Sequence, residues 1–263
     1  MWHRRIVFVV MLCAVASLAA CGGRPSGLSV AGSTSAQPLT EVLAEAYVAA
    51  GGERVRVQGG GSTAGVHAVL AGVADLAAVS RTLSAEETRQ GLKAHIIAYD
   101  VLTIIVHPAN PVSPLTTRQV RAIFAGEIRD WAGVGSRGGR IHVISREAGS
   151  GSREAFREAV GSITPSALVQ GSAGAIRAAV AQDPQAIGYV SLGAAHAGGV
   201  RSVAVDGRTP GGAGYRLVRP IALVALGQPK SGAVGFVRFA LSTAGQRLVA
   251  SEGLVPVHAG LAR

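Results

Sequence analysis

The chain has 263 residues, of which 48% are hydrophobic and 15% are charged, and its mean hydropathy is +0.36. This is enough apolar material for a sizeable core and argues against a disordered chain. Aromatic residues make up only 4%, and the formal net charge of +10 comes from Lys and Arg residues scattered without a long run. The composition therefore argues against a single-stranded nucleic-acid binder, which would interleave aromatic and basic side chains, and against an exposed nucleic-acid arm. The positive charge favours an anionic partner, but charge alone does not choose between nucleic acid, a membrane or wall surface, and a small anion.

The first twenty residues have the three-part layout of a secretory signal peptide. Arg4 and Arg5 are basic, an apolar run follows, and small residues stand before Cys21. The apolar run is too short for a spanning helix, and Leu18-Ala-Ala-Cys21 resembles a bacterial lipobox. We expect residues 1–20 to be a lipoprotein signal peptide and 21–27 a lipidated Cys21 with a flexible tether; an uncleaved anchor or ordinary cleavage is the alternative. The protein would then be exported and lipid-anchored to the bacterial cell membrane, facing the periplasm or cell exterior.

Strand and helix signals alternate in the first half of the remaining chain. Apolar or alternating runs predict strands at Leu28 to Ala31, Arg54 to Gln58, Leu76 to Val79 and Ile96 to Val106. Helices are expected between them, one with Pro38 in its first turn, one after Ser62, and one that starts at a capping box of Ser84 and Glu87.

The second half continues this alternation. Thr116 and Gln119 form the capping pair of a predicted helix. Further helices are predicted through Phe156 and Val160, from Gly174 to Gln182, and through Val234, Val237 and Leu241. Strands are predicted at Ile141 to Ser145, Ile187 to Val190, Arg201 to Val205 and Leu217 to Leu226.

The order of these elements predicts an α/β architecture with mostly parallel sheets. Length does not decide between one large domain and two lobes. The long strands at Ile96 to Val106 and Leu217 to Leu226 are the expected crossings between lobes.

Four strand-to-helix turns are rich in Gly, Ser and Thr. They are Gly32 to Ser35, Gly61 to Thr63, Ser80-Arg81, and Arg146 to Ser152. A helix N-terminus offers unpaired N–H groups, glycine allows close approach to the backbone, and hydroxyls add donors, so such turns suit a tetrahedral oxyanion. Any one turn could be an ordinary helix cap, and Arg81 or Arg146 could form a structural salt bridge. Their recurrence at the carboxyl ends of strands favours a binding site.

These motifs resemble the bacterial phosphate-binding proteins of ABC phosphate importers, the PstS family. The segments that carry the resemblance are the lipobox, Ala31 to Leu39, Gly60 to Gly65, Ala74 to Arg81, Ile123 to Trp131, Arg146 to Ser152, Ala186 to Tyr189 and Gly245 to Val249. They cover nearly the whole exported chain, and the Arg-x-x-Gly-Ser-Gly-Ser segment is the most specific.

The resemblance implies a two-lobed, type II-like periplasmic-binding-protein fold that closes on one phosphate. Lobe I would comprise residues 28–103 and 219–263, and lobe II residues 104–218, with hinge strands joining them. The implied phosphate-binding residues are Thr34, Ser35, Ser62, Ser80, Arg81, Arg146, Ser150, Gly151 and Ser152. The implied partners are inorganic phosphate and the permease subunits of an ABC importer, the protein is expected to be a monomer, and no cofactor is implied.

The sequence departs from the family's pattern at two acidic positions. The family's best-known members have an Asp where this chain has Arg81, and a second acid where it has Ala148. A carboxylate that accepts the proton of hydrogen phosphate separates phosphate from sulfate, so strict phosphate selectivity is open. Asp100 and Glu147 are alternative acceptors, and each could instead be structural.

The sequence also bears on three other functions. An enzyme is disfavoured because the sequence has no Gly-x-Ser-x-Gly elbow, no Gly-Lys-Ser/Thr phosphate loop and no metal-binding His spacing. A sensor or surface-binding protein would use the same fold, and a receptor for sulfate or molybdate would use the same turns. The sequence does not separate these two from a phosphate transport component.

Overall fold

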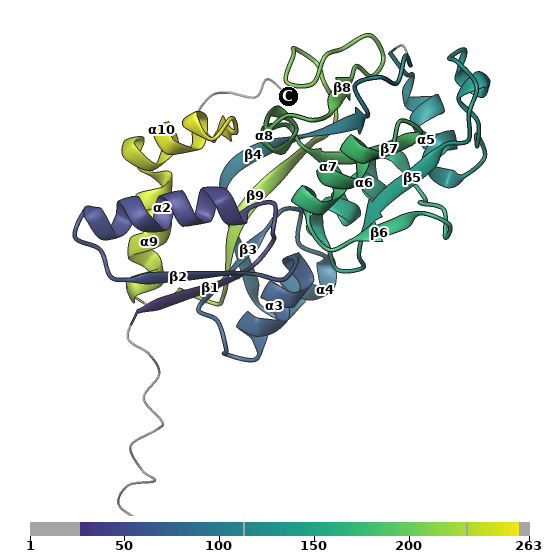
Figure 1. Cartoon of the computed structure of the whole chain (residues 1–263). Helices are drawn as coiled ribbons and strands as arrows, with labels where there is room; N and C mark the ends of the chain where they lie inside the picture. The colour runs from purple at the N-terminus through teal and green to yellow at the C-terminus, as the bar shows by residue number, and fades with distance from the viewer. Residues whose placement is uncertain (1–26, 113, 230, 258–263) are drawn as a thin grey trace, which may run out of the picture.

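The computed structural model describes residues 27–112, 114–229 and 231–257. Cys21 and the predicted signal peptide lie outside these residues, and so does most of the predicted tether. The described chain is a mixed α/β structure built on one continuous series of strands, in the order β2-β1-β3-β9-β4-β7-β5-β6 (Figure 1). Within the described residues there is no helix both long enough and apolar enough to cross a membrane.

The first end of the sheet consists of three parallel strands with helical connections. Its elements are β1 (Leu28–Gly32), α2 (Gln37–Ala49), β2 (Val55–Gly59), α3 (Ser62–Leu70), β3 (Leu76–Val79) and the short α4 (Ala85–Arg89). β1 lies between β2 and β3 and is parallel to both. Because each connection returns the chain to the same edge, the turns after β1, β2 and β3 lie together at the carboxyl ends of the strands.

The other end of the sheet repeats this arrangement. Its elements are α5 (Thr117–Ala125), η2 (Trp131–Val134), β5 (His142–Arg146), α6 (Gly151–Val160), β6 (Leu168–Gln170), α7 (Ala173–Gln182), β7 (Ala186–Ser191), α8 (Leu192–His196) and β8 (Arg201–Val203). β5 is parallel to both β6 and β7. The turn that follows β5 leads directly into α6.

Two long strands, β4 (Leu92–Val106) and β9 (Val218–Leu226), join these ends (Figure 1). Most of β4 pairs with β9, while the segment from Leu102 to Val106 pairs with β7. The prediction of mostly parallel sheets is therefore wrong at the centre, where β4 is antiparallel to β7, β8, β9 and β10, and β9 is antiparallel to β3. The physical reason is connectivity: the chain enters the second half on β4 and returns on β9 in the opposite direction.

The apolar core is divided between the two ends. One large cluster, which includes Phe124, Trp131 and Phe156, draws its buried residues from positions 101–217. Another, which includes Leu43 and Phe236, draws them from positions 28–98 and 221–249. Each end also has a smaller cluster. Each end thus has its own core, as expected of a two-lobed fold, and the first and last parts of the described chain share a core.

The C-terminal part contains elements that the sequence analysis did not predict. After α9 (Ser231–Leu241) come α10 (Thr243–Ser251) and the short β10 (Val255–Pro256), which pairs with β4. The Ser242 hydroxyl caps α10 by accepting from the Gly245 N–H. This helix packs on α2 and α9 and completes the cover of lobe I (Figure 1).

Candidate anion-binding site

The four predicted turns meet between the two lobes. Ser33, after β1, donates a 2.8 Å hydrogen bond to Ser80 Oγ at the end of β3. The Ser35 and Ser152 hydroxyls share a 2.8 Å hydrogen bond across the lobes. The N–H of Thr63 in α3 donates to the Gly149 carbonyl at 3.1 Å. The folded chain therefore brings all four turns to one place, with α3 and α6 beginning there.

The turn after β1 is organised by Ser33, which the sequence analysis did not select. The Ser33 hydroxyl is buried and accepts from the N–H groups of Ser35 and Ala36 at 3.2 and 3.3 Å. Thr34 Oγ1 accepts a 3.0 Å hydrogen bond from Arg146 of the other lobe. Ser33 thus fixes the turn, while Thr34 and Ser35 both bond to groups of lobe II. A serine between the end of a strand and the start of a helix is typical of a serine turn, and this position in the sequence could have identified Ser33.

The α3 and α6 turns approach each other closely at Gly151. A Cβ at Gly151 would lie only 2.2 Å from Ser62 Oγ and 2.6 Å from Ser80 Oγ. Ser62 and Ser80 are fully buried, and Ser62 Oγ accepts from the Ser80 N–H at 3.2 Å. Only glycine allows this approach, which places the first N–H groups of α6 beside the serines of lobe I.

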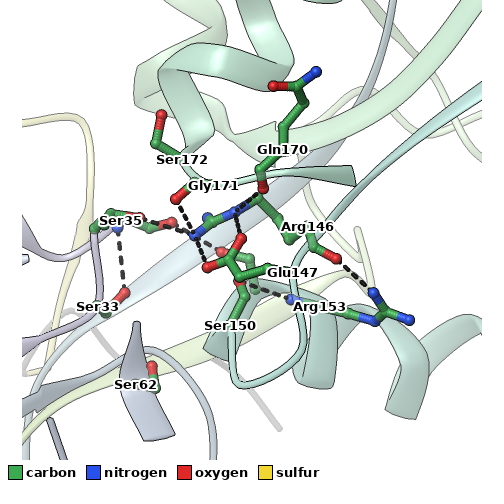
Figure 2. A network of polar contacts seen from close by, with 12 residues as sticks. Ser33, Ser35, Ser62, Arg146, Glu147, Ser150, Arg153, Gln170, Gly171 and Ser172 are labelled. Carbon is green, nitrogen blue, oxygen red and sulfur yellow. Dashed lines mark hydrogen bonds and ion pairs between the residues drawn. The ribbon is translucent and has the colours of Figure 1, made fainter. Parts of the chain in front are cut away.

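Ser150 caps α6, and Arg146 lies under the same turn. The Ser150 hydroxyl accepts from the Arg153 N–H, and Arg146 is 2% exposed. Arg146 Nε and Nη2 donate to the Glu147 carboxylate at 2.8 and 2.7 Å (Figure 2). Nη2 also donates to Thr34 Oγ1. The carbonyls of Gln170 and Gly171 accept from the same guanidinium at 3.2 and 3.3 Å. The guanidinium group of Arg146, a planar fork of three nitrogens, is therefore held in one orientation, facing the turn after β1.

An aromatic group supports this turn from the lobe II core. Tyr189 on β7 stacks on Phe156 of α6, with ring centroids 3.9 Å apart. The Tyr189 hydroxyl is 2.9 Å from Ser145 Oγ and accepts from the Arg146 N–H at 3.4 Å. Burial raises the pKa of Tyr189 above its usual value, so the phenol remains a neutral hydrogen-bonding group at ordinary pH. Strand β5 and helix α6 are thereby fixed relative to each other.

Arg81 makes a different set of contacts. Its Nη1 and Nη2 each donate to the Glu87 carboxylate at 2.7 Å, and its Nε forms an ion pair with Glu154 of α6. Burial acts to lower the pKa of Arg81, but the Glu87 hydrogen bond and the nearby Glu154 charge outweigh it and raise the pKa. The hydrogen bond from Arg81 also lowers the pKa of Glu87. Arg81 thus forms an ion pair that bridges the lobes, which was the alternative considered for it.

A second arginine that the sequence analysis overlooked lies at the centre of the site. Arg219 on β9 pairs in register with Asp100 on β4, and they are only 2% and 1% exposed. Arg219 Nη1 donates to Ser152 Oγ at 2.6 Å and to Ser80 Oγ at 3.2 Å. The signal was present in the sequence as one charged residue of opposite sign within each apolar crossing strand. Strand register, which the sequence did not give, brings them together.

The described residues do not include a group of three or more His, Cys, Asp or Glu side chains suited to a metal ion. What they bring together is a set of hydroxyls, helix N-terminal N–H groups and guanidinium groups. Such a set can bind a tetrahedral oxyanion by hydrogen bonds from many directions.

Known proteins provide independent comparisons. A family model described as a PBP superfamily domain matches residues 19–244. The phosphate-binding protein PstS of Borreliella burgdorferi is 24% identical over 97% of this chain and 99% of its own length. A phosphate ABC transporter substrate-binding protein of Clostridium perfringens, solved with bound phosphate, is 35% identical, with a TM-score of 0.83 over 88% of this chain and 99% of that one. An ABC-type phosphate transport receptor of Vibrio cholerae is 32% identical, with a TM-score of 0.74 over 87% and 99%.

The family match covers most of the chain, and the structural matches span nearly the whole length of the two solved relatives. Both agree with the two cores, the crossing strands and the converging turns described above. The chain therefore belongs to the PBP superfamily and is PstS-like, as the motif resemblance predicted.

Proposed function

We propose that this protein captures inorganic phosphate outside the cytoplasmic membrane and delivers it to an ABC-type importer. The observation that carries the proposal is the convergence of serine turns and helix N-termini from both lobes onto one place. The Clostridium perfringens relative, which has the same fold, was solved with phosphate bound. Closure of two lobes around an anion excludes water and so strengthens every hydrogen bond in the site.

The proposed phosphate ligands are the residues of the converging turns. They are Thr34, Ser35, Ser62, Ser80, Arg146, Ser150, Gly151 and Ser152. Arg146 supplies fixed positive charge, Gly151 a backbone N–H, and the others hydroxyl or backbone donors. For Arg81 we propose an indirect role, in which its ion pair with Glu154 holds the lobes together.

The proposal extends to the organisation of the whole protein. Lobe I comprises residues 28–103 and 219–263 and lobe II residues 104–218. The separate apolar clusters at the two ends support this division, except that Val101 and Leu102 pack into the cluster of lobe II. The protein acts as a monomer, catalyses no reaction, and is held at the membrane by a lipid on Cys21. Replacement of Cys21 by Ala would then abolish labelling by a radioactive fatty acid, whereas retained labelling would contradict the anchor.

Titration calorimetry of the purified protein, freed of bound anion by dialysis, tests the function. We expect phosphate to bind with micromolar or tighter affinity and sulfate and molybdate to bind much more weakly. Equal binding of sulfate would instead indicate a general oxyanion receptor, and no binding of any of the three anions would favour a sensor or surface-binding protein. Phosphate uptake by cells that carry or lack the protein then tests delivery to an importer.

A further inference from the structure

The crossing strands contain a buried ion pair that folding alone does not require. Asp100 and Arg219 face each other across β4 and β9, in strands that are otherwise apolar at their centres. Removing two charges from water is costly, and an apolar pair of similar volume often stabilises a fold equally well or better. The pair therefore calls for an explanation beyond stability.

Asp100 fixes the orientation of Arg219. Oδ2 of Asp100 accepts from Nε and Nη2 of Arg219 at 2.9 and 2.7 Å, and Oδ1 accepts from the Ser191 hydroxyl at 2.5 Å. This arrangement leaves Nη1 on the side of the guanidinium that faces the anion site. There it donates to Ser152 of lobe II and to Ser80 of lobe I, so that one nitrogen on a crossing strand contacts both lobes.

The hydrogen bonds determine what the serines can offer to an anion. Ser80 Oγ accepts from Ser33 and from Arg219, which uses both of its lone pairs and leaves its own proton to donate. The Ser62 oxygen lies 3.5 Å away, at the long limit of a hydrogen bond, so a closer anion oxygen would be the better acceptor. Ser152 Oγ accepts from Arg219 and also shares a hydrogen bond with Ser35. Because Arg219 donates to both oxygens, each serine keeps its own proton for another acceptor, which is the role that an oxyanion requires.

We propose that Arg219, held by Asp100, is a positioning residue of the anion site: it orients the Ser80 and Ser152 hydroxyls toward the anion when the lobes are closed. The inference rests on the phosphate site proposed above. Because the two serines belong to different lobes, Arg219 stabilises the closed, loaded state rather than the encounter with phosphate. Its loss should therefore increase the dissociation rate while leaving the association rate nearly unchanged.

The test compares the single variant Arg219→Met with the double variant Asp100→Leu/Arg219→Met in the purified full chain. The single variant leaves a buried, unpaired carboxylate and is expected to unfold easily. The double variant removes both charges and should retain the wild-type circular dichroism spectrum and cooperative unfolding. We expect it to bind phosphate about 10- to 100-fold more weakly, the range for loss of a charge-assisted hydrogen bond.

The dissociation rate of radiolabelled phosphate, chased with unlabelled phosphate, should rise by about the same factor, with the association rate changed by less than about threefold. Wild-type affinity in the folded double variant would show that the pair is only structural and would overturn the inference. A slower association with unchanged dissociation would overturn it as well, because Arg219 would then only attract the anion. If the wild-type protein binds no phosphate, the proposed function itself is wrong. That result differs from wild-type affinity in the double variant, which would overturn only the role of Arg219.

Discussion

Arg81 and Arg146 occupy equivalent places in the two lobes, yet their guanidinium groups have different surroundings. Each follows a fully buried serine at the end of a strand, Ser80 after β3 and Ser145 in β5. Arg146 bonds to its neighbour Glu147 and still reaches the turn after β1. Arg81 is enclosed by carboxylates of α4 and α6.

Both guanidinium groups are bound by a carboxylate through two nitrogens. The difference teaches that the position of that carboxylate, on α4 for Arg81 and on the next residue for Arg146, sets the direction of a strand-end arginine. Glu87 both completes the capping box of α4, by accepting from the Ser84 N–H, and binds the Arg81 fork. Its carboxylate therefore holds the Arg81 guanidinium beside α4, although Nη2 still lies 3.4 Å from Thr63 Oγ1 in α3. Beside Arg146 the carbonyls of Gln170 and Gly171 hold the fork at the first turn. Arg146 is thus suited to bind an anion, and Arg81 to join the lobes.

Replacement of Arg146 by Ala should produce the largest effect on binding. The guanidinium is buried and reaches the turn after β1. Its loss removes a fixed positive charge from the site, so we expect phosphate affinity to fall by at least about 100-fold. The exposed Arg137, on the same lobe, provides the matched control, because Arg137→Ala removes the same charge from the surface. Calorimetry of both variants checks the prediction, and equal affinities would refute the role of Arg146.

A methyl group at Gly151 should have the next largest effect. The new Cβ of Gly151→Ala would overlap Ser62 Oγ, so the lobes could not close to the same distance. Overpacking costs about 1–3 kcal/mol, and we therefore expect affinity to fall by at least about fivefold. Gly138→Ala is the control, since its Cβ would meet no atom nearer than 3.6 Å. If the Gly151 variant bound phosphate like wild type, the close approach of the lobes would not be needed for binding.

Removal of the charge on Glu154 should have a smaller effect on phosphate binding, because it weakens the ion pair with Arg81 that bridges the lobes. The Glu154 side chain is 36% exposed, so solvent weakens its ion pair with Arg81, and we expect Glu154→Gln to speed phosphate release by about two- to fivefold. Glu158→Gln, on the same helix, is the control for the loss of a negative charge. The release rate of phosphate is measured by radiolabel chase for both variants. Equal release rates would argue against a bridge between Arg81 and Glu154.

The smallest expected effect is on acid stability. Because Arg81 lowers the pKa of Glu87 in the folded protein below the usual 4.5, the Glu87 contribution to stability is fully present above that value. It is lost as the pH falls through the lower, folded pKa. Urea unfolding at pH 7 and pH 3.5 should show a smaller loss of unfolding free energy for Glu87→Gln than for wild type. An identical loss in both proteins would contradict the Arg81–Glu87 pairing.

The sequence predicted the parts of the site that depend on local chemistry. Glycine, serine and threonine at strand ends identified the converging turns, and apolar periodicity identified most of the strands and helices. It did not predict the pairing of Asp100 with Arg219, because that contact depends on the register of two strands far apart in the chain. Nor did it predict the direction of the Arg81 fork, which depends on how α4 and α6 pack. The antiparallel centre of the sheet was missed because alternation of strands and helices does not reveal the direction of the crossing strands.

The most direct test of this account is a crystal structure of the protein grown with phosphate. We predict one phosphate between the N-termini of α3 and α6, within hydrogen-bonding distance of Arg146, Ser150 and the first turn, while Arg81 remains paired with Glu87 and Glu154. Phosphate bound to the Arg81 guanidinium, or at a place that contacts only one lobe, would contradict it.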